Sequence, residues 1–264
     1  MRVADRFNSL PDRRAIIDRR ALWEAAMELG AGERGLPQKR AALAVLLKEA
    51  LNDGRAEIAR RLMERPTRGR EATTAQAFLI DQLLRVLYDF TVEYLYPSAN
   101  RSAGERLTLI AVGGYGRAEM APQSDIDIGF LTPFKQTPWA EQVIESMLYT
   151  LWDLGLKVGH SSRSLDDMVR MAKADLTIRT ALLEGRYIWG DVPLYEEASA
   201  RFLNEVEVGT EKAFVAQKLA ERDERHKRLG DSRYVVEPNV KEGKGGLRDL
   251  QTLYWIGKYI HGVG

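Results

Sequence analysis

Residues 107–133 constrain the fold of this chain more than any other segment, because they combine two short strand patterns with a glycine turn. The run LTLIAVGG is apolar, contains β-branched residues and ends in Gly113 and Gly114, which predicts a buried strand. In QSDIDIGFLTP, apolar residues alternate with Asp125, Asp127 and a glycine, the period of a strand with one polar face. The segment therefore predicts two strands joined by a polar connection.

Helical patterns lie on both sides of this segment. Apolar residues recur at three-, four- and seven-residue steps before Pro66 and again before Pro97, which predicts two long amphipathic helices. A further helix is predicted from Thr137 as its N-cap to Gly155, and LKVGHSSRS predicts a third strand. The succession of strand, turn, strand, helix and strand indicates a small mixed sheet.

The last third is predicted to be mostly helical. SLDDMVRMAKADLTIRTALLEGRYIWGD is interpreted as one or two short helices, and Pro193 is expected to begin a long charged helix that reaches about Arg228. A basic, glycine-containing stretch follows, and LQTLYWIGKYI predicts a final apolar helix. We therefore expect an α+β fold. A small mixed-sheet core at residues 105–192 would be flanked by helical regions at residues 1–104 and 193–264.

Composition restricts the class of function. The chain has no cysteine and only three histidines, which excludes disulfide frameworks and thiol nucleophiles and leaves little room for a His-rich metal site. Thirty-nine Lys and Arg against 38 Asp and Glu give a net charge of +1, which argues against a nucleic-acid or membrane partner. Every apolar run is far shorter than the roughly 18 residues of a membrane span. The first residues lack the apolar core of a signal peptide. We expect a cytoplasmic protein.

Asp125 and Asp127 form the central candidate site. Two positions apart on a strand, their carboxylates project from the same face, where like charges repel and raise carboxylate pKa values. A cation between them would relieve this repulsion, and oxygen ligands without nearby His or Cys favour Mg²⁺ or Mn²⁺ over zinc. Gly113 and Gly114 end the preceding strand, where glycine lets backbone N–H groups approach a phosphate. Together these are the parts that hold a metal–nucleoside triphosphate.

Each part has a plainer interpretation on its own. Gly113, Gly114 and Gly116 match neither the P-loop nor the dinucleotide fingerprint, and alone they indicate only a tight turn. Asp-Ile-Asp alone would fit a solvated edge strand. The two features together, each bracketed by apolar strand patterns, favour the nucleotide–metal site.

The same residues carry a family resemblance. Gly113-Gly114, followed after a gap by Ser124-Asp125-Ile126-Asp127-Ile128, resembles the signature of the polymerase-β-type nucleotidyltransferase superfamily. Four blocks are similar, in the same order, to the uridylyltransferase part of the bifunctional uridylyltransferase/uridylyl-removing enzymes: GGYGRAEMAPQSDIDIGFL, LKVGHSSRS, DLTIRTALLEGRYIWGD and EPNVKEGKGGLRDLQTLYWI. The similarity runs from about residue 105 to the end of the chain, and more loosely through the N-terminal helical region.

The resemblance implies transfer of UMP from UTP to a tyrosine hydroxyl of the nitrogen-regulatory protein PII, with release of pyrophosphate. It implies that Asp125 and Asp127 are catalytic residues that bind Mg²⁺ or Mn²⁺. It also implies that the segment KEGKGGLRD binds nucleotide rather than forming only a solvated basic loop. The implied nucleotide-binding residues are Gly113, Gly114, Ser124, Lys241, Lys244 and Arg248.

Two departures from the family pattern matter. The superfamily usually has a third carboxylate on a later strand, where LKVGHSSRS has Gly159 and His160; Glu184 and Asp175 are candidates by sequence proximity only. The third ligand and the general base therefore stay open, and His160 fits a structural role as well as a base. The whole enzymes also carry a His-Asp hydrolase domain and amino-acid-sensing domains. The chain has no His-Asp pair in sequence, and we expect an N-terminal fragment without uridylyl removal or glutamine sensing.

Two other functions compete with this one. An adenylyl-transferring relative is disfavoured by the EPNVKEGKGGLRD block, whereas a non-catalytic nucleotide-sensing module is supported by the missing third carboxylate. Arg117 and Glu119 are interpreted as a surface ion pair. Four tryptophans in apolar patterns are expected in the core: Trp139, Trp152, Trp189 and Trp255.

Overall fold

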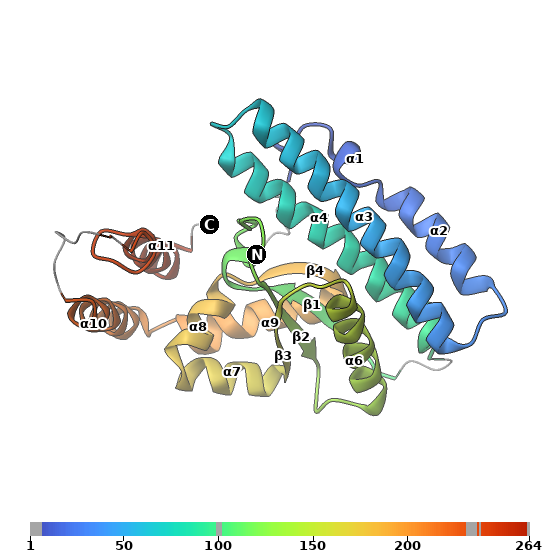
Figure 1. The fold of residues 1–264 in the computed structure, drawn as a ribbon. Helices are drawn as coiled ribbons and strands as arrows, with labels where there is room; N and C mark the ends of the chain where they lie inside the picture. Colours follow the sequence, from blue (N-terminus) through green and yellow to red (C-terminus); the bar gives the residue numbers. More distant parts are fainter. Residues whose placement is uncertain (1–6, 99–101, 231–236, 238, 263–264) are drawn as a thin grey trace. The chain divides into compact units, whose positions relative to one another are not determined.

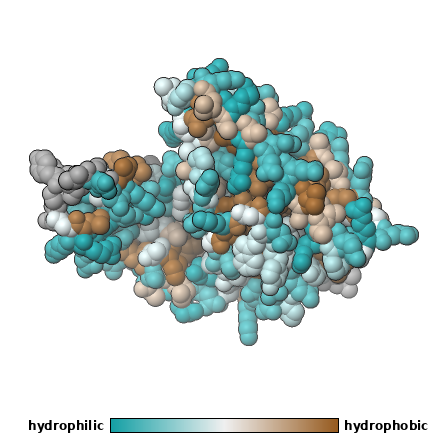
Figure 2. Space-filling view, viewed as in Figure 1, coloured by the Kyte–Doolittle hydropathy of each residue, from teal (hydrophilic) through white to brown (hydrophobic). Residues whose placement is uncertain are grey.

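The computed structural model describes residues 7–98, 102–230, 237 and 239–262. The chain forms two compact units, Met1–Met168 with Glu184–Ala198, and Val169–Leu183 with Ser199–Gly264. Helices dominate both units, and the first holds a small mixed sheet (Figure 1), so the fold is α+β as predicted. Hydrophilic side chains cover most of the surface visible in Figure 2, with apolar residues exposed in scattered patches.

A helical bundle makes up the N-terminal part of the first unit (Figure 1). After the short α1 (Arg13–Ile16), it contains α2 (Arg19–Ala31), α3 (Leu36–Glu64) and α4 (Gly69–Phe90), which continues into a π-helical turn, η1 (Thr91–Leu95). The two long helices predicted before Pro66 and Pro97 are confirmed as α3 and α4 with η1. The helix α2 was not placed by the sequence, although Asp18 caps it by accepting from two backbone N–H groups.

The sheet has the strand order β3-β2-β1-β4. Strands β1 (Thr108–Ala111), β2 (Ile126–Thr132) and β3 (Val158–Ser164) are the three predicted strands. The pairs β1–β2 and β1–β4 are antiparallel, and β2–β3 is parallel. Helix α6 (Pro138–Asp153) connects β2 to β3, with the Thr137 hydroxyl as its N-cap and Gly155 at φ +77 after its end, as predicted.

One face of β2 belongs to the main core. Its alternate apolar residues join a buried cluster with side chains of α6 and of the helical bundle. The cluster residues on β2 are Ile126, Ile128 and Phe130. The opposite face begins with the acidic positions and becomes buried farther along, at Gly129 and Leu131. The polar face expected from the alternation is therefore confined to the start of the strand.

Two segments differ from the prediction. Residues expected to be helical up to Asp191 include a fourth strand, β4 (Arg186–Gly190), because the β-formers Tyr-Ile-Trp pair with the free edge of β1. The helix expected from Pro193 to Arg228 is divided into α9 (Val192–Phe202), η2 (Leu203–Glu207) and α10 (Glu211–Arg228). Gly209 lies between them at φ +81, a conformation that ends a helix.

The second unit is helical. It includes α8 (Leu176–Leu183), α10 and α11 (Leu247–His261), and α7 (Leu165–Ala174) leads into it. Helices α10 and α11 pack together, and the rings of Phe214 and Tyr259 stack at 3.8 Å between centroids. The final helix predicted from LQTLYWIGKYI is confirmed as α11. In neither unit does a described helix have the length and hydrophobicity to cross a bilayer.

Candidate functional site

The acidic motif lies at the start of β2. Asp125 is exposed and directly precedes the strand, whereas Asp127 is half-buried within it. The backbone N–H of Val112 donates to the Asp127 carbonyl oxygen at 3.0 Å, which ties the glycine turn after β1 to the acidic end of β2. Ser124 is exposed immediately before Asp125. The first unit therefore brings the glycine turn and the two aspartates together.

The glycine turn is a single helical turn, α5 (Gly113–Gly116). Gly113 has φ +60, and a Cβ at this position would lie 3.4 Å from Oδ2 of Asp127. A Cβ at Gly114 would lie 3.3 Å from the Glu119 carbonyl oxygen, and one at Gly116 only 2.2 Å from that of Glu184. Gly116 is thus required for packing, while Gly113 is required for backbone conformation and lies beside the carboxylate.

The adjacent strand β3 shapes the other side of Asp127. Gly159 is the register partner of Asp127, and a Cβ there would be 2.4 Å from Oδ1 of the carboxylate. Any side chain at position 159 would displace the Asp127 carboxylate, which is a physical reason for glycine at this position. Among the residues that the structure describes, no three His, Asp or Glu side chains converge on one point where they could hold a metal.

The two carboxylates carry uncompensated charge. Burial raises the pKa of Asp127 above its ordinary value, and the negative charge of Asp125 raises it further. Within the described ranges, no ion pair or hydrogen bond involves either carboxylate group. Paired oxygen donors without a protein cation have the chemistry of a Mg²⁺ or Mn²⁺ site, so these residues fit such an ion.

Neither proposed third carboxylate joins this pair. Glu184 is buried and ion-pairs with Arg117, which also donates to Glu119 at 3.0 Å. The predicted surface pair of Arg117 and Glu119 is therefore part of a larger, partly buried group. Asp175 lies in the second unit, where its carboxylate accepts from the Thr177 and Ile178 N–H groups at the start of α8.

His160 lies on the other face of the sheet. Its register partner is Ile128, one position away from Asp127, so its side chain points away from the carboxylates. It is exposed and meets Trp152 edge-on, with 6.2 Å between ring centroids. Trp152 was expected in the core but is 45% exposed, beside the exposed His160 of the edge strand β3. Trp255 is buried, and Trp139 and Trp189 are half-buried.

The basic glycine loop belongs to the second unit, whereas the aspartates belong to the first. The Arg248 guanidinium donates to Gln251 and Glu242 and lies 5.6 Å from the Trp255 ring centroid. Lys244 lines a cavity of about 660 Å³ between α10 and α11, and Lys241 is exposed. The structure therefore gives the three predicted basic residues different surroundings.

Sequence reasoning missed the residue that fixes this loop. The Asp249 carboxylate lies 3.0 Å from Nε2 of His226 and pairs with Arg225, and it accepts from the Gly245 N–H at 2.7 Å. Although burial alone would raise it, the pKa of Asp249 is lowered by the Gly245 N–H, His226 and Arg225. The sequence signal was an acidic residue three positions after Gly246.

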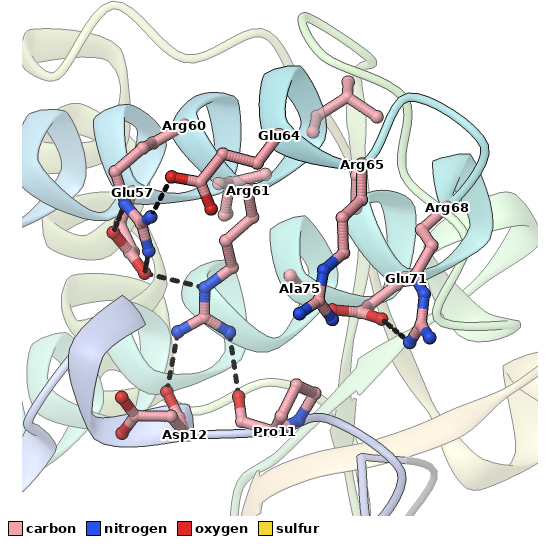
Figure 3. Close-up of a pocket in the computed structure, with 13 residues that line it drawn as sticks. Pro11, Asp12, Glu57, Arg60, Arg61, Glu64, Arg65, Arg68, Glu71 and Ala75 are labelled. Atoms are coloured by element: carbon pink, nitrogen blue, oxygen red, sulfur yellow. Dashed lines mark hydrogen bonds and ion pairs between the residues drawn. The ribbon is translucent and has the colours of Figure 1, made fainter.

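A second cavity, of about 230 Å³, lies in the helical bundle of the first unit (Figure 3). Three of its four arginines, Arg60, Arg61 and Arg68, have hydrogen-bond partners, and Arg61 donates to the carbonyl oxygens of Pro11 and Asp12 at 2.8 and 2.9 Å. Hydrogen bonds from Arg60 and Arg61 lower the pKa of Glu57 to about 2. The hydrogen bonds of Arg61 join the segment before α1 to α3, whereas Arg65 lines the cavity without an ion pair among the described residues.

The comparisons with known proteins agree with the motif order. A family model described as GlnD PII-uridylyltransferase matches residues 213–264, which contain most of α10 and all of α11. A bifunctional uridylyltransferase/uridylyl-removing enzyme of Novosphingobium aromaticivorans is 68% identical over 256 residues, which are 96% of this chain and 28% of the relative. The enzyme of the same name from Erythrobacter litoralis is 64% identical over 252 residues, covering 96% of this chain and 27% of the relative.

Over nearly its whole length the chain is thus similar to one part of the bifunctional uridylyltransferase/uridylyl-removing enzymes. The resemblance inferred from the four sequence blocks is thereby confirmed. The chain spans just over a quarter of the length of these family members. Lys241, Lys244 and Arg248 lie in the segment that the family model matches, whereas Asp125 and Asp127 lie outside it.

Proposed function

We propose that this chain transfers UMP from UTP to a tyrosine hydroxyl of PII and releases pyrophosphate. The observation that carries the proposal is the unpaired carboxylate pair of Asp125 and Asp127 beside a glycine turn. The proposal is supported by 68% identity to a protein named uridylyltransferase. We further propose a cytoplasmic protein without a nucleic-acid or membrane partner, which fits the net charge of +1.

Asp125 and Asp127 would hold Mg²⁺ or Mn²⁺. When bound, such an ion neutralises charge on the phosphates and orients the reacting oxygens. Asp127 is held by the strand pairing of β2, and the bare backbone of Gly159 leaves room for its carboxylate. These residues fix one side of the reaction centre before any ligand is bound.

We assign the nucleotide phosphates to the backbone of Gly113 and Gly114 and to the Ser124 hydroxyl, because Gly113 lies beside the Asp127 carboxylate, Gly114 follows it in the turn and Ser124 directly precedes Asp125. The assignment of Lys241, Lys244 and Arg248 to nucleotide binding rests on the family resemblance. His160 is not proposed as the base for the tyrosine hydroxyl, since its side chain lies on the sheet face opposite to Asp127.

The direct test incubates the chain with purified PII and labelled UTP or ATP, with and without Mg²⁺. We expect label on PII from UTP only, and only with the metal. Label from ATP alone would favour an adenylyltransferase, and nucleotide binding without transfer would favour a sensing module.

The residues are tested by Asp125→Asn and Asp127→Asn, each of which is expected to abolish transfer while the protein stays folded. Asp53→Asn, an exposed change on α3, serves as the matched control. Transfer at the control rate by either site variant would remove that residue from the metal-binding role.

A further inference from the structure

Two polar residues on β3 share the sheet face of Asp127 and have no assigned role. The register pairs Asp127 with Gly159, Gly129 with Ser161 and Leu131 with Arg163. Since alternate residues of a strand point to the same face, Ser161 and Arg163 continue the row that begins beside the Asp127 carboxylate.

Arg163 is held in place by Ser161. Its Nη1 donates to the Ser161 hydroxyl oxygen at 2.9 Å, and that oxygen lies 3.8 Å from the position that a Cβ on Gly129 would take. The Ile110 side chain fills the space over Gly129, where a Cβ would lie 2.8 Å from its Cγ1, so the Ser161 hydroxyl lies beside a buried apolar group. The Arg163 side chain is half-buried, so its orientation is restricted.

The charges on this face are not matched by protein groups. For the part of the chain that the structure describes, Arg163 forms no ion pair with a carboxylate. The backbone positions of Asp127 and Arg163 are about 13 Å apart along the paired strands, because four residues each rise about 3.3 Å. The Arg163 guanidinium reaches back to Ser161, two residues nearer to Asp127, and within the described residues it forms no ion pair with that carboxylate. The face thus carries an anionic group at one end and a cationic group at the other.

A metal-bound nucleoside triphosphate carries charges that match the two ends of this face: the metal cation suits the carboxylates, and the phosphate anions suit the arginine. The reacting α-phosphate must lie at the carboxylate end, where the metal would be held. The more distant arginine would then contact the β- and γ-phosphates, which leave as pyrophosphate. Arginine presents planar, paired N–H donors that match phosphate oxygens. We propose that Arg163, positioned by Ser161, binds the β- and γ-phosphates of the nucleoside triphosphate; this rests on the proposed function of the Asp125–Asp127 site.

The test measures the binding of Mg²⁺–UTP and of UMP to the 264-residue chain by calorimetry, which requires no turnover. Arg163→Gln is expected to weaken UTP binding about tenfold, the usual size of a lost charge-assisted hydrogen bond, and to leave UMP binding unchanged. Arg163→Lys should retain part of the affinity, and Ser161→Ala should cause a smaller loss than Arg163→Gln. Arg55→Gln, an exposed change on α3, is the matched control.

Unchanged UTP affinity in Arg163→Gln would overturn the assignment, and so would equal losses for UTP and UMP. A raised KM for PII with unchanged UTP affinity would overturn it in favour of an acceptor contact. If Arg163→Gln fails to fold by circular dichroism, Arg163→Lys and Ser161→Ala decide by the same comparison of UTP with UMP.

The two proposals fail separately. Wild-type chain that binds UTP through Arg163 but transfers no UMP would contradict only the proposed function. Wild-type chain that transfers UMP while Arg163→Gln binds UTP normally would contradict only this inference.

Discussion

Two carboxylates near the glycine turn differ in whether protein groups compensate their negative charge. Asp81, on α4, is fully buried and accepts hydrogen bonds from the Tyr115 hydroxyl at 2.7 Å and from both terminal nitrogens of Arg186 at 2.6 and 2.9 Å. Asp127 is half-buried beside the same turn, and the described residues provide it with no such donor. A carboxylate whose charge is compensated internally holds the fold together, whereas one left uncompensated is available for a cation from solution.

The largest loss of stability is expected from a substitution of Asp81. Asp81→Asn leaves the Arg186 guanidinium, itself only 9% exposed, as a buried charge without its partner. Breaking a buried ion pair in this way lowers the free energy of unfolding by about 3–5 kcal/mol. Urea unfolding measures this loss, with Asp127→Asn as the comparison. A loss below about 1 kcal/mol would show that the network does not anchor the turn.

The next effect is expected at Gly159. In Gly159→Ala the new Cβ meets Oδ1 of Asp127 at 2.4 Å, so either the carboxylate or β3 must move. Since the position is exposed and the atom met is the end of a side chain that is unpaired among the described residues, we expect stability to change by only about 0.5 kcal/mol, but uridylyl transfer to drop at least tenfold.

Gly257→Ala on α11 is the control for this change, because a Cβ there meets nothing within 4 Å. It should stabilise the helix by about 0.5–1 kcal/mol. If Gly159→Ala behaves like the control, Asp127 does not depend on the bare strand backbone.

The dependence of stability on pH should differ in sign between Asp127 and Asp191. Hydrogen bonds from Arg106 lower the pKa of Asp191, so its contribution of about 1 kcal/mol is present above its unfolded pKa of about 3.9 and is lost as pH falls. Burial and Asp125 raise the pKa of Asp127, so this carboxyl costs no stability below about 3.9, and the protein loses stability as pH rises through the raised value.

Urea unfolding in EDTA between about pH 3 and pH 7 tests these signs. Asp191→Asn should be less stable than wild type at pH 7 and equal to it in acid. The difference between Asp127→Asn and wild type should likewise vanish in acid. Curves for the two variants that change in the same direction would contradict the contrast.

The smallest effect is the change in the free energy of unfolding that Asp127→Asn causes at pH 7 without metal. Removing one of two repelling, partly exposed charges should leave stability unchanged or raise it by up to about 0.5 kcal/mol. Thermal unfolding measures this shift. Clear destabilisation would mean that the charged Asp127 carboxylate has a stabilising partner in the protein.

Local sequence patterns were sufficient to predict much of this fold. The alternation at Asp125–Phe130 and the apolar run before Gly113 predicted two adjacent strands because period two reports burial on one face directly. The caps of α6 followed from Thr137 and Gly155 for a similarly local reason. Strand β4 was missed because its pairing with β1 connects residues about 80 positions apart, a contact that no local pattern records.

The site was predicted less completely than the fold. The aspartates and the glycine turn were proposed as a site because Asp is depleted within strands and two of them, two positions apart, share one face beside the turn. The pairing of Glu184 with Arg117 depends on tertiary packing, and so does the contact of Gly159 with Asp127. The roles of Asp81 and Arg186 were invisible for the same reason, since each is an isolated charge in an apolar sequence pattern.

The central claim is that Asp125 and Asp127 hold a divalent cation, and Mn²⁺ titration followed by electron paramagnetic resonance tests it most directly. The wild-type chain with UTP is expected to bind Mn²⁺, and Asp127→Asn to bind it at least tenfold more weakly, while Asp53→Asn matches wild type. Equal Mn²⁺ affinity in wild type and Asp127→Asn would contradict the account.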